Sequence, residues 1–567
     1  MSDAAVAETP KVAKRPTRSW SNYWPYLLAA LVGLLAKLPT LNNNIIFIDE
    51  PTYLMHARRL DSLETFFYSF SYRTEPKFQL GLLPDLLALA ISPPNAILIM
   101  RLCGLVAVMV SGGLLLSLSQ LMFGERVPGW FAWLLWLFFL NRNAADVVPL
   151  LEYFQTPLLL FSLWLLIKAS GRSTYIFWAG FMVALAGLIK PTALIVAPVL
   201  ILGLYALAHP WLKPGKWSFV KRLAGQIAWL GSGISLPLGV FILPYLLRPT
   251  ALADLKFNLI EISSSYGALG NKSLLTRTLE LLAIFENTNL GLIIISGLSY
   301  LVIKVFAFSP FRGPQGRKAP PEIGLPPLQA KIRGTTRLNW REGWQHADTY
   351  QLLLWLMGWG LFAGFAVGQA KFHYLVPILP FLLLFVGYRL RLLHHWLPHP
   401  RLKLAFATLL TLWLILSEAY AIIFYAGLYF DNGNIYRAQM PNLDEAALIN
   451  YIQLNSAPQD YIWVYYNAPE IYWLADRRPA TSDSVGSWLV YMYTPFWFER
   501  IRRELEQDNP TLIIGIDQPR YPLASVDKLT ELPRLKDWLV QKYTCSEAVV
   551  PQAIVCKRNI ASAQTKE

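Results

Sequence analysis

Runs of about 18 or more apolar residues recur through the first three quarters of the chain. In a helix, a run of that length spans the hydrocarbon core of a bilayer. A mean hydropathy of +0.37 over 567 residues is too apolar for a soluble protein of this size. The sequence therefore predicts a mainly α-helical protein that crosses a membrane many times.

About eleven of these runs are predicted to be transmembrane helices. They lie at residues 23–41, 95–123, 128–141, 153–168, 174–190, 192–208, 224–247, 281–307, 349–367, 373–388 and 404–427. No small-residue cleavage site follows the first run, so we expect a retained span and not a signal peptide. A further stretch, 78–92, is short for a span and contains Pro84 and Asp85. We expect it to form a helix in the membrane interface.

The net charge of +14 is spread unevenly over the loops. Lys and Arg concentrate in the N-terminal tail, residues 1–22, and in alternate loops such as 308–348. Under the positive-inside rule the N-terminus is cytoplasmic, and the loop 42–94 and everything after about residue 428 lie outside. The basic excess is thus a signal of topology, which excludes a nucleic-acid partner. We expect a multi-pass protein of the plasma (inner) membrane, with the bilayer as its first partner.

The C-terminal part, residues 429–567, has the pattern of a small soluble α/β domain outside the membrane. Residues 461–466 and 511–516 are predicted strands, and 495–507 a helix between them. Residues 542–548 and 553–558 are predicted to form a hairpin. This domain carries no nucleophile triad and no phosphate loop, so we expect it to cap the membrane part.

The chain contains three cysteines, Cys103, Cys545 and Cys556, too few for a cysteine-rich metal module. Cys545 and Cys556 lie at equal distances from the centre of the predicted hairpin, so they can face each other across its strands. An extracytoplasmic location permits a disulfide there. Two unpaired thiols are the alternative.

Two acidic residues, Asp49 and Glu50, stand just beyond the first predicted span, at the start of a predicted helix. An acidic residue before a proline is also common at the start of a helix. The two acids could therefore serve only to begin this helix. Positions 53, 57 and 60 form one apolar stripe, as in a helix that lies along the membrane surface.

A second acidic element, Glu152, lies at the mouth of the predicted span 153–168. A carboxylate that deep is costly without a partner, which makes it a candidate functional group. Asp146, a few residues earlier, is the more solvated alternate.

The cationic candidates lie at predicted span ends on the same outer face. Lys190 falls at the turn between two spans, and Lys371 precedes the span 373–388. Lysines at span ends commonly snorkel to the interface. The functional reading is that they hold a lipid phosphate, with Arg58 as a third cation. A carboxylate that deprotonates an acceptor, combined with cations that stabilise a leaving phosphate, would support glycosyl transfer.

Several motifs occur in an order that resembles the GT-C superfamily of integral-membrane glycosyltransferases, in particular its protein O-mannosyltransferase and aminoarabinose-transferase branch. They are Asp49-Glu50 with Tyr53 and Ala57-Arg58, the stretch 78–92, Arg101, Glu152 with Pro157-Leu158-Leu159-Leu160-Phe161, Gly187 to Pro191, and Lys371 with His373-Tyr374-Leu375-Val376-Pro377. The resemblance covers about the first 430 residues. It implies a GT-C fold over residues 23–428, followed by the outer α/β domain.

The resemblance also implies roles for individual residues. Asp49 would be the catalytic residue, which acts as the base or orients the acceptor, with Glu50 beside it. Glu152 would be the second active-site acid, with Asp146 as the alternate. The family often has Arg where this chain has His373, so Lys371 and His373 with Tyr374 would share the contact with the donor phosphate.

The implied reaction is an inverting transfer of a sugar from a polyprenyl-phosphate carrier to a protein, lipid or cell-surface glycan. The sequence predicts no certain cofactor and leaves a divalent cation open; the lipid-linked sugar is the substrate. Two alternatives remain. An oligosaccharide ligase with a diphosphate carrier predicts a large outer loop between late spans. A transporter or flippase predicts ionisable residues in mid-span, whereas here they lie mostly near span ends.

Overall fold

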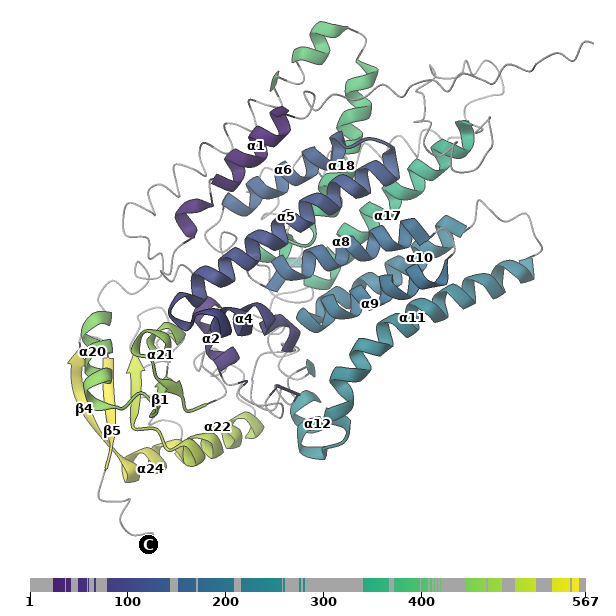
Figure 1. The fold of residues 1–567 in the computed structure, drawn as a ribbon. Helices are drawn as coiled ribbons and strands as arrows, with labels where there is room; N and C mark the ends of the chain where they lie inside the picture. The colour runs from purple at the N-terminus through teal and green to yellow at the C-terminus, as the bar shows by residue number, and fades with distance from the viewer. Residues whose placement is uncertain are drawn as a thin grey trace, which may run out of the picture.

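The protein consists of a bundle of long helices with a small β-sheet at one end (Figure 1). The computed structural model describes residues 24–35, 37–41, 49–58, 60, 66–67, 79–142, 151–169, 172–208, 216–256, 259–260, 275–276, 279–280, 340–366, 372–397, 399–405, 408–409, 412, 416, 419, 444–465, 468–481, 495–516, 533–550 and 553–559.

The bundle buries one large apolar core between its helices. Its helices are α1 (Trp24–Leu35), α5 (Ala96–Phe123), α6 (Val127–Arg142), α8 (Leu151–Ala169), α9 (Ser173–Ile189), α10 (Val196–Ala208), α11 (Lys216–Leu246), α17 (Trp340–Ala366) and α18 (Leu379–Trp396). Short 3-10 segments precede or follow them: η2 (Leu38–Thr40), η5 (Pro93–Asn95), η6 (Pro191–Ile195) and η9 (Phe372–Leu375).

Several predicted spans match observed helices closely. α5, α6, α8 and α9 fall on the runs 95–123, 128–141, 153–168 and 174–190. α11 and α17 begin earlier than predicted, at Lys216 and Trp340, because polar residues there extend the helices beyond the apolar runs. The run 281–307 and most of 404–427 lie outside the described residues.

By length and hydropathy, two of the described helices are suited to cross a bilayer, over Pro93–Phe123 and Phe219–Leu246. The predicted number of about eleven spans therefore stays a prediction. The outer surfaces of these two helices are apolar. α5 exposes Val106 (61%) and Val110 (49%), and α11 exposes Val240 (53%) and Leu243 (54%). Spacings of three and four residues place each pair on one helix face.

Glycines allow α9 and α11 to pack backbone against backbone. A Cβ at Gly180 would lie 2.2 Å from the Leu230 carbonyl oxygen, and one at Gly233 would lie 2.0 Å from the Phe177 carbonyl oxygen. Small residues at such crossings are typical of helices that associate within a membrane.

Two short helices lie between the bundle and the sheet (Figure 1): α2 (Asp49–Arg58), and α4 (Leu83–Ile91) with the preceding η4 (Gln79–Leu82). A helix was predicted at 78–92, and η4 and α4 occupy that stretch. Asp85 and Ala88 are buried, so α4 packs closely against its neighbours. α12 (Pro249–Lys256) follows α11 at the same end.

The C-terminal part forms a five-stranded sheet in the order β2-β1-β3-β5-β4. Its strands are β1 (Tyr461–Tyr465), β2 (Arg478–Pro479), β3 (Leu512–Ile516), β4 (Tyr543–Val550) and β5 (Ala553–Arg558), and its helices are α20 (Glu445–Asn455), α21 (Pro469–Ala475), α22 (Pro495–Asp508) and α24 (Pro533–Lys542). β1 pairs in parallel with β2 and β3, whereas β5 is antiparallel to both neighbours.

β1, β3, the helix before β3 and the hairpin agree with the sequence analysis, whereas β2, α20, α21 and α24 were not predicted. In the hairpin, Cys545 lies opposite Cys556, and the two are joined by a disulfide. Cys103 is a free cysteine.

The apolar stripe of residues 53, 57 and 60 was predicted to lie along the membrane surface, whereas Tyr53 and Ala57 of α2 are buried within the protein. Residues 50–57 are buried. Tyr53 packs in a cluster with Leu151 and Ile189, Leu54 packs against α4 and α5, and Met55 lies in the core of the sheet domain. The helix is enclosed because the C-terminal part folds back over it, a contact that local periodicity does not reveal.

Candidate functional site

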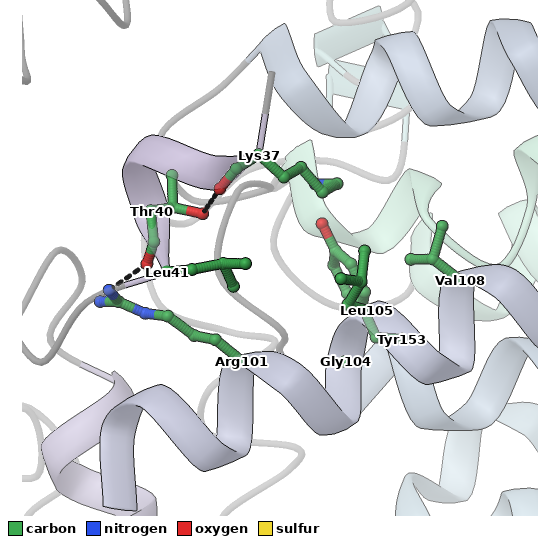
Figure 2. Close-up of a pocket in the computed structure, with 8 residues that line it drawn as sticks. All are labelled: Lys37, Thr40, Leu41, Arg101, Gly104, Leu105, Val108 and Tyr153. Atoms are coloured by element: carbon green, nitrogen blue, oxygen red, sulfur yellow. Dashed lines mark hydrogen bonds between the residues drawn. The ribbon is translucent and has the colours of Figure 1, made fainter. Parts of the chain in front are cut away.

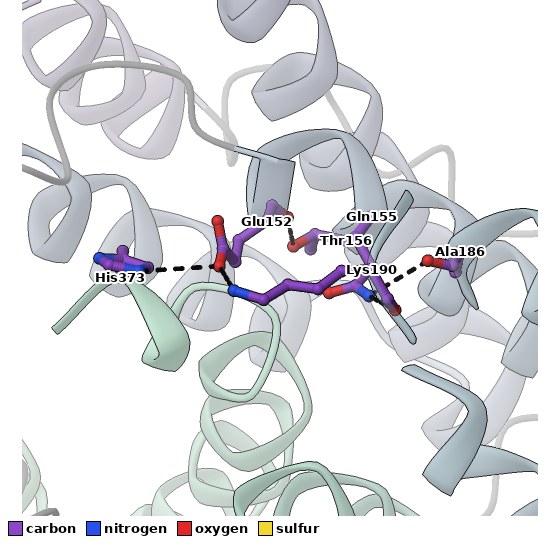
Figure 3. Close-up of polar contacts among 6 residues, drawn as sticks. All are labelled: Glu152, Gln155, Thr156, Ala186, Lys190 and His373. Atoms are coloured by element: carbon purple, nitrogen blue, oxygen red, sulfur yellow. Dashed lines mark hydrogen bonds and ion pairs between the residues drawn. The ribbon is translucent and has the colours of Figure 1, made fainter. Parts of the chain in front are cut away.

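Four of the predicted site residues meet at one place in the bundle. Glu152 forms an ion pair with Lys190, and the Nε2 atom of His373 lies 3.9 Å from the same carboxylate oxygen (Figure 3). The Lys190 ammonium lies 4.1 Å from the centre of the Tyr374 ring, a cation–π distance. α8, the end of α9 and η9 each supply part of this cluster, which we call the Glu152 site.

Glu152 occupies the first turn of α8. A negative charge is favoured there by the helix dipole, but the side chain is only 2% exposed. A buried carboxylate needs a charged or hydrogen-bonding partner. Lys190 supplies it, so the pairing follows from the cost of burial.

Lys190 stands at a break between two helices. Pro191 follows it, and a residue before proline is pushed out of the α conformation. Lys190 accordingly has extended backbone angles, φ −148° and ψ 119°, and ends α9. Its side chain is 21% exposed, against 2% for that of Glu152, so Lys190 is the member of the pair that is more open to solvent or a ligand.

Gln155 fixes this break from the neighbouring helix. Its side-chain amide donates hydrogen bonds to the carbonyl oxygens of Ala186, at 3.2 Å, and Lys190, at 3.0 Å (Figure 3). Gln155 is fully buried. The sequence analysis did not single out this residue. A polar side chain one turn after Glu152 in an apolar run was the signal for it.

His373 and Tyr374 come from the short η9 segment before α18. Their rings stand edge to face, 4.5 Å apart. The indole N–H of Trp136 on α6 donates to the carbonyl oxygen of Val376 at 2.9 Å, which holds the segment against the bundle.

The helix α2, which carries Asp49, packs beside the Glu152 site. Tyr53 belongs to one apolar cluster with Leu82, Leu151 and Ile189, and the last two are next to Glu152 and Lys190 in sequence. Position 49 lies one helical turn before Tyr53, and residues four apart share a face of a helix. The backbone of α2 therefore brings position 49 within one helical turn of this apolar cluster.

Glu50 lies on another side of α2, in a buried ion pair. Arg101 of α5 donates to both of its carboxylate oxygens, at 2.8 and 2.9 Å, and also to the carbonyl oxygen of Thr40. Glu50 and Arg101 are 0% and 2% exposed. This bidentate pair anchors the start of α2 to α5 and η2, a positioning role distinct from that of Asp49.

Arg58 lies away from the Glu152 site, at the other end of α2. Its guanidinium forms an ion pair with Asp476 at 3.0 Å and lies 4.4 Å from the centre of the Trp473 ring. Both partners belong to the C-terminal part of the chain.

Three predicted site groups fall outside what the structure describes: Asp146, Lys371 and the side chain of Asp49. Their roles stay predictions.

A small cavity next to the Glu152 site has Tyr153 as one of its lining residues (Figure 2). Lys37 and Arg101 supply its charged lining. The Lys37 ammonium is 3.4 Å from the carbonyl oxygen of Leu140 and 5.7 Å from the centre of the Tyr153 ring. The cavity adjoins the anchor of α2 and adds no residue to the Glu152 site.

Among the described residues, no three His, Cys, Asp or Glu side chains gather as they would around a metal ion. The divalent cation that the sequence left open therefore gains no candidate ligand set in this part of the chain.

Comparison with solved structures identifies the fold. The structure of ArnT from Cupriavidus metallidurans bound to undecaprenyl phosphate aligns with a TM-score of 0.52 and 12% identity, covering 95% of this chain and 99% of that one. The apo structure of the same ArnT aligns at 0.50 and 12%, covering 95% and 98%.

The oligosaccharyltransferase AglB from Archaeoglobus fulgidus, in complex with an inhibitory peptide and a dolichol-phosphate, gives a looser likeness. Its TM-score is 0.46 at 14% identity, with 96% and 75% covered. No protein-family model and no curated protein sequence matches this chain. The alignment with ArnT, a GT-C glycosyltransferase, runs over nearly the full length of both chains, and the chain therefore has the GT-C fold that its sequence motifs predicted.

Proposed function

We propose that this chain is an integral-membrane glycosyltransferase that takes its sugar from a polyprenyl-phosphate carrier. The observation that carries the proposal is the Glu152 site, where three distant segments gather a buried acid and basic groups beside the helix of Asp49. The fold around this site is shared with ArnT, which binds undecaprenyl phosphate. A phosphate head group requires such cations near the surface of the membrane.

A bilayer accounts for the apolar outer surfaces of α5 and α11, which would promote aggregation in water. The disulfide between Cys545 and Cys556 fits an oxidising compartment, in line with the predicted extracytoplasmic side of residues 429–567. The N-terminus would then be cytoplasmic, in the plasma (inner) membrane.

In the proposed reaction, Asp49 accepts a proton from a hydroxyl or amine of the acceptor. The deprotonated atom forms a bond to the anomeric carbon of the sugar. The bond between that carbon and the phosphate oxygen breaks, and its electron pair leaves with the carrier phosphate. Attack from the face opposite the phosphate inverts the anomeric configuration.

Lys190 and His373 would stabilise the negative charge that develops on the leaving phosphate. Because the side chain of Lys190 is more exposed than that of Glu152, we expect an entering phosphate to meet Lys190 first. Glu152 keeps that cation in position while no donor is bound. The acceptor would be a protein, a lipid or a cell-surface glycan, and the sugar a hexose or pentose.

Binding of undecaprenyl phosphate to the purified protein in lipid nanodiscs tests the donor half of the proposal. We expect Lys190→Ala to weaken this binding roughly tenfold to a hundredfold, since a charge-assisted contact is lost. Lys168→Ala is the matched control, because Lys168 lies at the other end of α8, against Trp164. Equal affinity of Lys190→Ala and wild type would remove Lys190 from the donor site.

Turnover tests the catalytic half. Membrane lipid extracts supply the donor, and mass spectrometry detects the released carrier. Asp49→Asn should abolish release while binding of undecaprenyl phosphate persists; near-normal release would contradict the role of Asp49. Release of a polyprenyl diphosphate instead of a monophosphate would favour the ligase alternative. Comparing lipid carriers and surface glycans in a deletion strain would identify the sugar.

A further inference from the structure

The C-terminal part of the chain packs against α2, the helix that carries Asp49. α21 packs against α2. Met55 of α2 is fully buried in the apolar core of the sheet domain, together with Ile471 and Tyr472 of α21. A side chain of the first loop thus completes the core of a domain that begins about 390 residues later in sequence.

Trp473 of α21 joins this contact to the bundle. Its ring packs against the domain core that holds Met55, and also against the cluster in which Leu54 meets α4 and α5. The guanidinium of Arg58 lies over the same ring and pairs with Asp476. The side chain of Arg58 is 30% exposed and that of Asp476 is 68% exposed, so the cation is the more shielded member of the pair.

The backbone around Asp476 is fixed by its neighbours. It ends α21 in a left-handed backbone conformation, with φ 52° and ψ 51°, which few residues other than Gly, Asn and Asp adopt readily. The next residue, Arg477, is buried and donates to the carbonyl oxygens of Gln453, Ser456 and Ala475. These bonds tie the end of α21 to α20, so the backbone that carries Asp476 is held in place.

The two ends of α2 are therefore fixed by different parts of the molecule. The Glu50–Arg101 pair fixes its start to the bundle, and Arg58 fixes its end to α21. A ten-residue helix transmits a shift at one end to the other, because its backbone hydrogen bonds make it stiff.

We propose that α21 is a clamp that positions α2, and that Arg58, Trp473 and Asp476 are positioning residues for Asp49 and not ligands of the donor phosphate. The expected effect of the clamp on turnover rests on the proposed glycosyl transfer. Its structural readout, the mobility of α2, is independent of any activity.

Asp476→Asn is the mildest test. Asparagine tolerates the left-handed conformation and keeps the shape of the side chain, while the ion pair is lost. Arg58→Ala removes the ion pair and the contact with the Trp473 ring. The matched control is Arg502→Ala, which breaks the Arg502–Glu506 pair of α22 in the same domain; its 3.1 Å is close to the 3.0 Å of the Arg58–Asp476 pair. All variants are made in the full-length protein in nanodiscs.

The measurement is amide hydrogen exchange of residues 53–58, followed by mass spectrometry, alongside turnover and binding of undecaprenyl phosphate. We expect exchange in α2 to rise roughly threefold in Asp476→Asn and roughly tenfold in Arg58→Ala, with no change in Arg502→Ala. Turnover should fall in the same order, while affinity for undecaprenyl phosphate stays at the wild-type value.

Wild-type exchange in both variants would overturn the clamp, whatever the protein catalyses. Unchanged exchange with weakened binding of undecaprenyl phosphate in Arg58→Ala would instead make Arg58 a donor ligand. If no variant and no wild-type preparation turns over a donor, the proposed function fails, and the exchange result still decides the clamp.

Discussion

Two buried carboxylates in the described part of the chain are held in ion pairs. Glu50 is matched by Arg101, and Glu152 by Lys190. Removing one member of such a pair leaves an unpaired buried charge and typically costs about 3 to 5 kcal/mol. Variants at these positions therefore need a binding or exchange measurement beside activity, because loss of turnover alone does not separate chemistry from folding.

Glu470, at the start of α21, differs from these residues. It is 4% exposed, and within the described part of the chain its Oε2 atom accepts no hydrogen bond. Burial raises the pKa of Glu470 well above its usual value of 4.5, a hydrogen bond from the backbone opposes this, and Glu445 raises the pKa further. In the folded protein the carboxyl group therefore keeps its proton at a pH where the unfolded chain has lost it.

This shift predicts a pH-dependent stability. A raised pKa in the folded state gives stability that is complete below the usual value of 4.5 and is lost as pH rises through the folded value. Within that window the free energy of unfolding should fall by about 1.4 kcal/mol per pH unit. Glu470→Gln should remove this slope in thermal unfolding of the protein measured from about pH 4 to pH 8.

The exposed Glu506→Gln on α22 is the control and should keep the wild-type slope. A wild-type slope in Glu470→Gln would show that another group causes the pH dependence.

At the scale of whole elements, the contact between α9 and α11 depends on the absence of side chains. The Cβ of any residue at position 233 would meet the backbone of Phe177, which cannot rotate away as a side chain can. The helices must therefore move apart to accept one, and the packing along the interface is lost.

We expect Gly233→Ala to destabilise the protein by about 1 to 3 kcal/mol, seen as a lower midpoint of thermal unfolding in detergent. Gly231→Ala, two residues away on the same helix, is the matched control, because a Cβ there meets nothing within 4 Å. The control should be neutral or slightly stabilising, since alanine favours a helix over glycine. Equal midpoints for the two variants would contradict this close packing.

At the scale of the whole molecule, the chain folds back so that its last part encloses a helix of its first loop. The Arg58–Asp476 pair joins residues 418 positions apart. Such a closure requires that the loop 42–94 and residues 429–567 lie on one side of the membrane, as the distribution of Lys and Arg predicts.

Labelling with a membrane-impermeant maleimide checks this topology. Cys103→Ser removes the free cysteine. In that background, Val540→Cys in the sheet domain, at a position 66% exposed, should react in intact spheroplasts. Lys221→Cys, at an exposed position near the start of α11, should react only after permeabilisation. The reverse pattern would invert the assigned topology.

The features that could be predicted from the sequence are those that depend on residues close together along the chain. The apolar runs predicted α5, α6, α8 and α9 closely, because the length of a run and the periodicity of a helix are local properties. Alternating and apolar segments predicted β1, β3 and the hairpin for the same reason. Glu152 was singled out because a carboxylate at the mouth of an apolar run is costly unless it has a partner. Lys190 was singled out as a cation at the end of a predicted span, and His373 through the resemblance to the GT-C superfamily.

The partners of these side chains became visible only in the folded structure. Glu152 pairs with Lys190 across 38 positions, and Gln155 holds the break at Lys190 from another helix. Arg58 was predicted to hold the donor phosphate, yet it contacts α21, because the folded C-terminal part offers a fixed carboxylate and an aromatic ring at the end of α2. Contacts of this kind arise from packing between distant segments, which no local pattern contains.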